Sequence, residues 1–451
     1  MIGGHMKSSF VALVAIAGLA GGMASAQAAD LGGDCCADLE ERVAELEATT
    51  ARKGNRKVSL TVSGWVNEAV LFWDDGVEQN AYQVTNLVAQ SRFRFVGSAK
   101  INADWSAGYL LELGVHGANS SQVTADTDDG GGPNAVGVRH SAWWLQSKQL
   151  GKLWVGQTSS ATDAITEINL ANTLHFATQN ASAHSGGFAV RTPAGVLTDV
   201  QLRQFMGGNN NATGGNTSAQ IGEGERFNVV KYETPTFAGF AMSVSAGEDD
   251  MWDVALRYAG EFSGFKIAAG VGYMKYTDLA AGDLNCATLN AANNNPAVQN
   301  HDCQQFGASG AIMHVPTGLY VHAAYGQRSD DNLFVAGSDD TSTQLYIQGG
   351  IEQNFFGIGK TTLFGEYQRW DIGSTVNAAG VLQSSGREMT MWGIGFNQAI
   401  DAAAMDLYVR YNNFDAECTA VVAGGCHTGG AAGRTSYQEF QTIMAGGKIN
   451  F

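Results

Sequence analysis

The sequence closes on a segment whose apolar or small residues recur at every second position: Ile443, Ala445, Gly447, Ile449 and Phe451. A helix would bring its apolar positions back at intervals of three and four, so this pattern predicts a β-strand with one apolar face that runs to the last residue. The same alternation, interrupted by Gly-rich and Asp-rich breaks, recurs back to about residue 57. Repeated segments of this kind are typical of a transmembrane β-barrel, so we expect transport through a pore.

Sixteen segments show this alternation. They cover residues 57–73, 89–102, 103–116, 137–147, 151–159, 225–234, 238–248, 251–261, 265–277, 305–315, 319–328, 341–354, 360–370, 386–398, 402–413 and 436–451. Tight turns alternate with long polar stretches, as expected for short periplasmic turns and long outer loops. The expected fold over residues 57–451 is therefore an all-β transmembrane barrel of 16 antiparallel strands around an aqueous channel. A propeller would repeat a motif every ~40–45 residues, and the sequence contains no such repeat.

Charged residues are expected on the inner faces of several strands. Arg92 and Arg94 lie two positions apart and must share one face, opposite Phe93 and Phe95, while Glu112 faces inward from the next strand. The basic residues proposed for the pore wall besides Arg92 and Arg94 are Arg226, Lys231 and Arg257, together with Arg139 and Arg410. For Arg139 and Arg226 the alternation alone does not fix the face.

Residues 160–224 are too long for an ordinary connection and follow the fifth strand, so they form the third outer loop. Residues 163–172 have helical composition, and the loop carries many apolar residues for a free outer segment. We therefore expect it to fold into the lumen and narrow it; a cap over the mouth is the alternative. Its acidic candidates are Asp163, Glu167 and Asp199. The acidic loop and the basic wall would together create a transverse electric field across the constriction.

Residues 1–28 are predicted to be a secretory signal peptide. They contain a charged start, the apolar run 10–23 and then small residues at alternate positions. Cleavage is expected after Ala26 or Ala28. Residues 1–5 are interpreted as an upstream extension.

Residues 29–56 are predicted to be a periplasmic coiled-coil segment and linker. Leu39, Val43 and Leu46 follow the d, a, d spacing of a heptad, which favours a parallel, three-stranded bundle on the barrel axis. Two heptads are too short to be stable alone, so the bundle would depend on the larger assembly. An amphipathic helix lying on its own barrel is the alternative.

Six cysteines in an exported chain predict disulfides. Proximity in sequence suggests Cys286 with Cys303 and Cys418 with Cys426, both as loop staples. The adjacent Cys35 and Cys36 could bond each other only with strain, so a bond between subunits and free thiols are the alternatives for them. No cysteine or histidine spacing typical of a metal site accompanies them, so no metal is expected.

The net charge of -17 excludes nucleic acid as a partner, because such binding needs a basic surface. Many of the aspartate and glutamate residues lie in loop-like runs. These runs are either a solvated surface or sites for divalent cations that bridge to lipopolysaccharide. No cofactor is expected otherwise. The sequence contains no nucleophile elbow, zinc-protease motif or phosphate loop, so we do not expect an enzyme.

Several short motifs together with the Phe451 ending resemble the general porins of alphaproteobacterial outer membranes, and the signal peptide, the Cys35–Cys36 pair and the expected helix over residues 38–50 are similar to the rhizobial branch of that family. The motifs are SRFRFVG at 91–97, SAGYLLELG at 106–114 and GKLWVGQ at 151–157. The resemblance implies homotrimers in the outer membrane of a Gram-negative bacterium, with one pore and one inward-folded loop for each subunit. It also implies that Arg92 and Arg94 face Asp163 and Glu167 across the constriction.

We therefore expect a channel for passive diffusion of small hydrophilic solutes and ions, with weak cation selectivity. A sugar- or anion-selective channel is one alternative; it would need an aromatic path, whereas Trp143, Trp144, Trp154 and Trp252 are more simply interpreted as lipid-facing anchors. A structural tether that contacts peptidoglycan through the coiled coil is another. Phe451 is the expected signal for the barrel-assembly machinery.

Overall fold

A computed structural model of the chain describes residues 57–129, 135–207, 220–247, 250–277, 302–330, 335–376 and 381–451. The predicted signal peptide and coiled coil, with Leu39, Val43 and Leu46, lie outside these residues. So do Cys35, Cys36 and Cys286.

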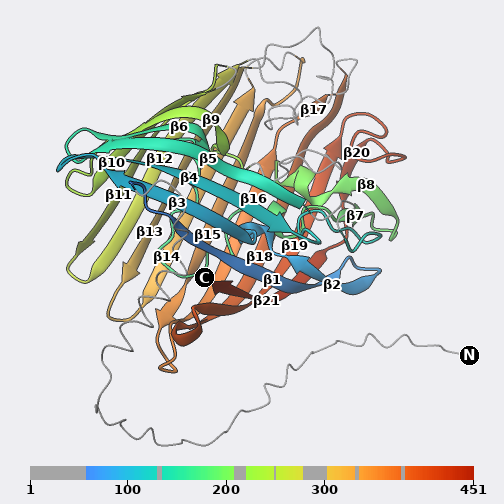
Figure 1. Cartoon of the computed structure of the whole chain (residues 1–451). Coiled ribbons are helices and arrows are strands. Elements are labelled where there is room, and N and C mark those ends of the chain that lie inside the picture. The colour runs from blue at the N-terminus through green and yellow to red at the C-terminus, as the bar shows by residue number, and fades with distance from the viewer. Residues whose placement is uncertain are drawn as a thin grey trace, which may run out of the picture. The chain divides into compact units, whose positions relative to one another are not determined.

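Sixteen of the strands within the described residues close into an antiparallel barrel, each paired with the next (Figure 1). They are β1 (Thr61–Asp74), β3 (Arg92–Lys100), β4 (Trp105–His116), β5 (Ala135–Ser147), β6 (Gly151–Ser159), β9 (Arg226–Glu233), β10 (Phe240–Gly247), β11 (Trp252–Phe262), β12 (Phe265–Thr277), β13 (Asp302–His314), β14 (Leu319–Asp330), β15 (Thr341–Gln353), β16 (Thr361–Ile372), β18 (Leu382–Ile400), β19 (Met405–Ala420) and β21 (Phe440–Asn450). The first strand pairs with the last, from Trp65 opposite Asn450 to Asp74 opposite Gln441, and this pairing closes the ring. The sixteen-stranded barrel expected from the sequence is confirmed.

Three short strands are present in addition to the expected sixteen, and each pairs with a barrel strand. β2 (Gln79–Thr85) pairs with the second half of β1 and is separated from β3 by the 3-10 helix η1 (Leu87–Ala89). β17 (Thr375–Val376) pairs with β18, and β20 (Gly433–Ser436) pairs with β19. The sequence did not predict β2.

Short turns join the strands at one end of the barrel, where the sequence predicted them. Gly264 and Gly318 occupy two of these turns with φ of 80° and 69°, a conformation that disfavours other residues. At Gly318 an added Cβ would also lie 1.9 Å from the carbonyl oxygen of Glu352, so only glycine fits there. A further turn contains the 3-10 helix η5 (Asp401–Ala403).

The two faces of each strand meet different surroundings. On β11, Trp252 and Leu256 are each 43% exposed, whereas Asp253 is fully buried and Arg257 is half-buried and bonded to the loop segment that follows β6. This alternation gives the barrel an apolar outer face and a polar inner face, as a lipid-embedded barrel requires.

The segment between β6 and β9, residues 160–225, is called the long loop below. It contains the short helix α2 (Ser182–Ser185), the hairpin β7 (Ala189–Arg191) and β8 (Leu197–Gln201), and the 3-10 helix η2 (Leu202–Phe205). The helix expected over residues 163–172 is wrong: this stretch is a series of turns and bends, and Ala164 has a φ of 59°, which a right-handed helix cannot include. Among the described residues, no helix has the length and apolar character that a membrane crossing requires.

The predicted disulfide between Cys418 and Cys426 is present and ties the end of β19 to the loop that follows. Cys303, at the start of β13, is also disulfide-bonded. Its predicted partner, Cys286, lies outside the described residues.

Candidate functional site: a charged passage beside the long loop

The long loop begins on a buried carboxylate of the inner wall. Asp253 of β11 accepts hydrogen bonds from the amide N–H groups of Ala161 (3.1 Å) and Thr162 (2.7 Å) and from the Thr162 hydroxyl (2.7 Å). Arg257, on the same face of β11, donates to the carbonyl oxygens of Ala161 (2.8 Å) and Asp163 (2.9 Å). Since this face of β11 points into the barrel, the loop starts inside it.

Further hydrogen bonds fix the loop to the inner faces of β13, β15, β16, β18 and β19. They join the Ile168 amide to Ser309 (3.2 Å), Asn169 to Gln348 (2.8 Å), the Asn172 amide to Glu352 (2.6 Å), Gln368 to the Gln179 carbonyl (2.7 Å), Asn397 to the Asn172 carbonyl (3.1 Å) and Arg410 to the Phe176 carbonyl (3.2 Å). The loop therefore crosses the interior, and the expected inward fold is confirmed.

An apolar cluster fills one side of the interior. Phe188 of the loop packs against Trp73 of β1, with ring centroids 5.2 Å apart, and against Phe440 of β21, at 5.0 Å. Val190, Leu202 and other buried residues of the loop belong to the same cluster. The open passage is left on the other side, between the loop and strands β3 to β9.

A cluster of three arginines lines the strand side of this passage. The Glu112 carboxylate, only 2% exposed, forms ion pairs with Arg92 (3.0 Å), Arg94 (2.8 Å) and Arg139 (2.8 Å). Below, these four residues are called the arginine cluster. Three guanidinium groups around one carboxylate leave a net charge of +2, and the shared carboxylate holds them on one surface.

Arg139 reaches this cluster through a β-bulge. Glu112 of β4 pairs with His140 of β5, but the next residue, Leu113, pairs with Val138, so Arg139 is the extra residue of the bulge. A bulge redirects a side chain out of the normal alternation, which explains why the sequence could not fix the face of Arg139.

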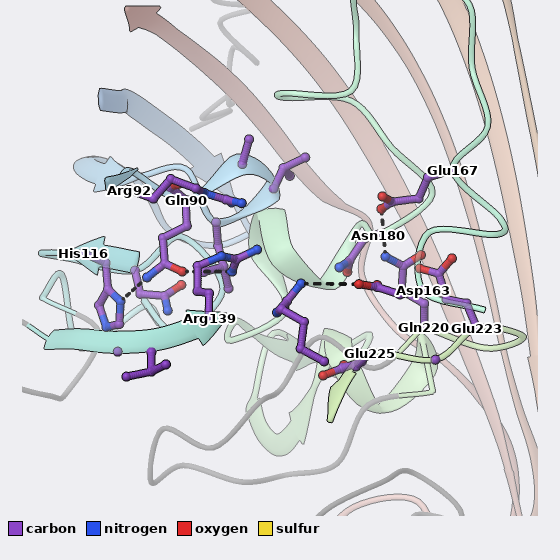
Figure 2. Close-up of a pocket in the computed structure, with 18 of the residues that line it drawn as sticks. Gln90, Arg92, His116, Arg139, Asp163, Glu167, Asn180, Gln220, Glu223 and Glu225 are labelled. Atoms are coloured by element: carbon purple, nitrogen blue, oxygen red, sulfur yellow. Dashed lines mark hydrogen bonds and ion pairs between the residues drawn. The ribbon is translucent and has the colours of Figure 1, made fainter. Parts of the chain in front are cut away.

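Carboxylates line the opposite side, on the long loop. Figure 2 shows Asp163, Glu167 and Glu223 across the passage from Arg92 and Arg139. Asp163 lies 3.9 Å from Arg226, the closest approach of the two charged sides.

Two of these carboxylates form no ion pair with any described residue. Glu167 accepts a hydrogen bond from Gln220 (3.1 Å), and Glu223 accepts from the amide (3.0 Å) and hydroxyl (2.8 Å) of Thr166. Burial raises the pKa of Glu223 well above its usual range, and the charges of Glu167 and Asp163 raise it further. Burial also raises the pKa of Glu167, although the hydrogen bond from Gln220 opposes this. Both groups can therefore change charge at a pH above the ordinary glutamate range.

The space between the two sides has a volume of about 570 Å³. Its charged lining consists of the guanidinium groups of Arg92, Arg139 and Arg226 and the carboxylates of Asp163, Glu167, Glu223 and Glu225. These three cations and four anions, when all ionised, leave a small excess of negative charge.

The structure brings together six of the residues predicted for the pore wall and the loop facing it: Arg92, Arg94, Arg139, Arg226, Asp163 and Glu167. Lys231 and Arg257 lie apart, in a second cavity of about 380 Å³ that shares only Asp163 with the first. Arg257 uses its donors to hold the loop.

Asp199 and Arg410 have other surroundings than the sequence suggested. Asp199 lies in β8 and accepts hydrogen bonds from the amide (3.0 Å) and hydroxyl (2.6 Å) of Thr428, in the loop after β19, so it does not line the passage. Arg410 is buried and paired with Glu366 at 2.6 Å. Both residues fix the loop in place, Asp199 through Thr428 and Arg410 through the Phe176 carbonyl.

Sequence reasoning missed Glu223 and Glu225 because they stand next to the following strand, at the far end of the long loop from Asp163. Their spacing around Gly224 carries no periodic signal, and only the fold of the loop brings them back to its start. The interpretation of Trp144 and Trp154 as lipid-facing anchors is wrong: both face the lumen beside Lys152.

No group of metal-binding side chains occurs among the described residues. The arrangement is a charged aqueous passage, and its side chains are suited to orienting water and ions.

Comparisons with known proteins agree with this architecture. A family model described as Gram-negative porin matches residues 12–291. A comparison with curated proteins finds no match.

Among solved structures, the chain is similar to the anion-selective porin from Comamonas acidovorans at 14% identity and a TM-score of 0.54, covering 87% of this chain and 100% of that one. It is also similar to the trimer form of OmpT of Vibrio cholerae (12%, 0.49, 87% and 99%) and to the outer membrane channel DcaP of Acinetobacter baumannii (14%, 0.48, 89% and 100%). At these identities the structural similarity establishes the fold alone. The family model covers more than half of the sequence, and the chain therefore belongs to the Gram-negative porin family and forms an outer-membrane channel for passive diffusion.

Proposed function

We propose that the channel is a weakly cation-selective diffusion pore for small hydrophilic solutes, with its constriction between the arginine cluster and the long loop. The observation that carries this proposal is the charged lining of the passage, where four carboxylates oppose three guanidinium groups. With all four carboxylates ionised, the lining carries one more negative than positive charge, so the preference for cations is small and depends on the ionisation of Glu167 and Glu223. Because the two signs of charge lie on opposite sides, the field across the passage orders water and dipolar solutes.

The cation preference is expected to increase as the pH rises and to fall on acidification. The protonated forms of Glu167 and Glu223 are neutral, and their pKa values lie above the usual glutamate range. Raising the pH through these values therefore adds negative charge to the loop side of the passage. The zero-current potential under a KCl gradient, measured over a series of pH values, reports this change directly.

The double variant Glu167→Gln and Glu223→Gln is the matched control for this pH series. Glutamine keeps the shape of both side chains and removes their titration. His116, which also lines the passage, remains in the variant and provides a reference for titration from the strand side. A pH dependence that is unchanged in the double variant would contradict the assignment to the two glutamates.

The assembly and the partners of the barrel are part of the same proposal. A homotrimer is supported by the family assignment. Divalent cations at acidic outer loops would bridge to lipopolysaccharide. Phe451 would be recognised by the barrel-assembly machinery. The short motifs support an alphaproteobacterial origin, and the amino-terminal features support a rhizobial-type one.

The amino-terminal segments complete this proposal. Residues 1–28 would direct export and be removed, and residues 29–56 would stand on the periplasmic side as a coiled coil that packs with its own copies or contacts peptidoglycan.

A further inference from the structure

Two indole rings lie on the inner wall, away from the arginine cluster. Trp144 of β5 and Trp154 of β6 are directly opposite in strand register, with ring centroids 6.3 Å apart. The neighbouring Trp143 is 51% exposed on the outer face, whereas Trp144 is buried. Thr158, four positions beyond Trp154 and thus on the same face of β6, contacts His140 beside the arginine cluster at 3.2 Å. Both indoles therefore face the lumen.

Lys152 stands against these two rings. Its ammonium nitrogen is 3.9 Å from the centroid of Trp154 and 4.5 Å from that of Trp144. Within the described part of the chain, this ammonium group forms no ion pair and no hydrogen bond. The electron-rich ring faces attract the positive charge, but they leave its N–H donors without an oxygen acceptor.

A second cation lies beside this group. Lys231 is 5.9 Å from the Trp154 ring and pairs with Glu233 at 3.0 Å; Glu233 also accepts a hydrogen bond from the Trp154 indole at 3.2 Å. Two lysines against one carboxylate leave a net positive charge. Lys231 and Glu233 line the second cavity, which Asp163 joins to the main passage. The side of the group formed by Lys231 and Glu233 is thus open to this cavity.

The position along the pore follows from the strand register. Ser159, at the end of β6, is opposite Arg226, and Lys152 lies seven positions back toward the short turn. At about 3.3 Å for each residue, Lys152 is separated from Ser159 by roughly 23 Å of strand, on the side of the short turns. A solute that has passed Asp163 would meet this group next.

We propose that Lys152, seated on Trp144 and Trp154, is a binding subsite within the pore for a small organic anion, specifically a carboxylate attached to an aromatic or other planar apolar group. The carboxylate would accept from the free N–H donors of Lys152, with Lys231 adding favourable charge, and the apolar part would lie along the indole edges. A neutral sugar is a poorer ligand, because the lysine already covers the ring faces on which sugars stack. Chloride would be attracted by the positive charge, but it has no apolar part that could contact the indoles, so it should bind more weakly.

This subsite rests on the proposed passage beside the long loop, and current block by benzoate tests it separately from the passage. Benzoate, added on the short-turn side of a planar bilayer, is expected to reduce the KCl current reversibly, and acetate should need a roughly tenfold higher concentration because it lacks the ring. Lys152→Met is expected to raise the half-blocking concentration of benzoate by about tenfold or more, while Lys152→Arg keeps the block.

Lys148→Met is the matched control. Lys148 lies in the adjacent turn, is exposed and donates to the Ala103 carbonyl at 2.7 Å, with no indole beneath it. This variant should be blocked like the unmodified protein. Heat-dependent mobility on a denaturing gel verifies that each variant has folded.

Equal block in Lys152→Met and in the unmodified protein would overturn the proposal. Binding of benzoate to the detergent-folded protein, followed by ligand-observed NMR, separates the two proposals because it needs no current. Benzoate binding that depends on Lys152, in a barrel without KCl current, would support the subsite and contradict the passage. Normal current with neither block nor binding would overturn the subsite alone.

Discussion

Replacing Asp253 by alanine is expected to raise the single-channel KCl conductance, by roughly twofold, since conductance follows the narrowest cross-section of a pore. The Asp253 carboxylate accepts three hydrogen bonds from Ala161 and Thr162 and one from Ser245, and it lies at the root of the long loop. Each hydrogen bond to a charged group contributes about 1.5–3 kcal/mol. Without the Asp253 carboxylate, the first residues of the loop lose these hydrogen bonds, and Asp163 moves with them.

Glu261→Ala on the same strand provides the control. Glu261 is exposed near the short-turn end of β11 and forms no ion pair with any described residue, so its loss should leave the conductance unchanged. Liposome swelling with sugars of increasing size gives a second measurement. If Asp253→Ala shows the same conductance and the same size limit as the unmodified protein, the anchor does not set the width of the pore.

The double variant Arg92→Ala and Arg94→Ala is expected to strengthen the preference for cations. The arginine cluster carries a net charge of +2, and the double substitution brings it to zero while Arg139 still pairs with Glu112. A unit charge at about 8 Å in water changes the energy of a passing ion by about 0.5 kcal/mol. After screening by salt, removing two charges should raise the K⁺ to Cl⁻ permeability ratio roughly two- to fivefold.

The zero-current potential under a KCl gradient measures this ratio. The charge-conserving variant Arg92→Lys and Arg94→Lys should keep the original value, although lysine cannot reproduce the fork geometry of arginine around Glu112. An unchanged potential in the alanine double variant would show that these arginines do not face the ion path.

Most of the barrel could be predicted from the sequence because the alternation of faces is a local property. Every strand that separates lipid from water must repeat with period two, and Trp252 with Asp253 or Phe93 with Arg94 carry this signal without any distant partner. β2 escaped because its residues, such as Gln79, Asn80 and Gln83, lack an apolar face directed to lipid. It is held instead by pairing with β1 and by packing of Tyr82 inside the barrel.

The site could be predicted only in part, since it depends on how the long loop is anchored. Arg92 and Arg94 share a face by geometry alone, and this face does point to the shared carboxylate of Glu112. The partners of Asp199 and the return of Glu223 toward Asp163 depend on contacts between residues far apart in the chain. Even the faces of Trp144 and Trp154 were assigned wrongly, because an indole near a membrane interface has the same composition signal on either side of the wall.

Single-channel current through the purified protein in a planar bilayer, under a KCl gradient, is the most direct test of an open diffusion pore. For an open trimeric pore, we expect a large conductance that rises linearly with salt concentration and a current that falls to zero in three equal steps. The reversal potential should have the sign of a weak preference for K⁺ over Cl⁻. Absence of current from protein shown to be folded by its heat-dependent gel mobility would contradict an open passage beside the long loop.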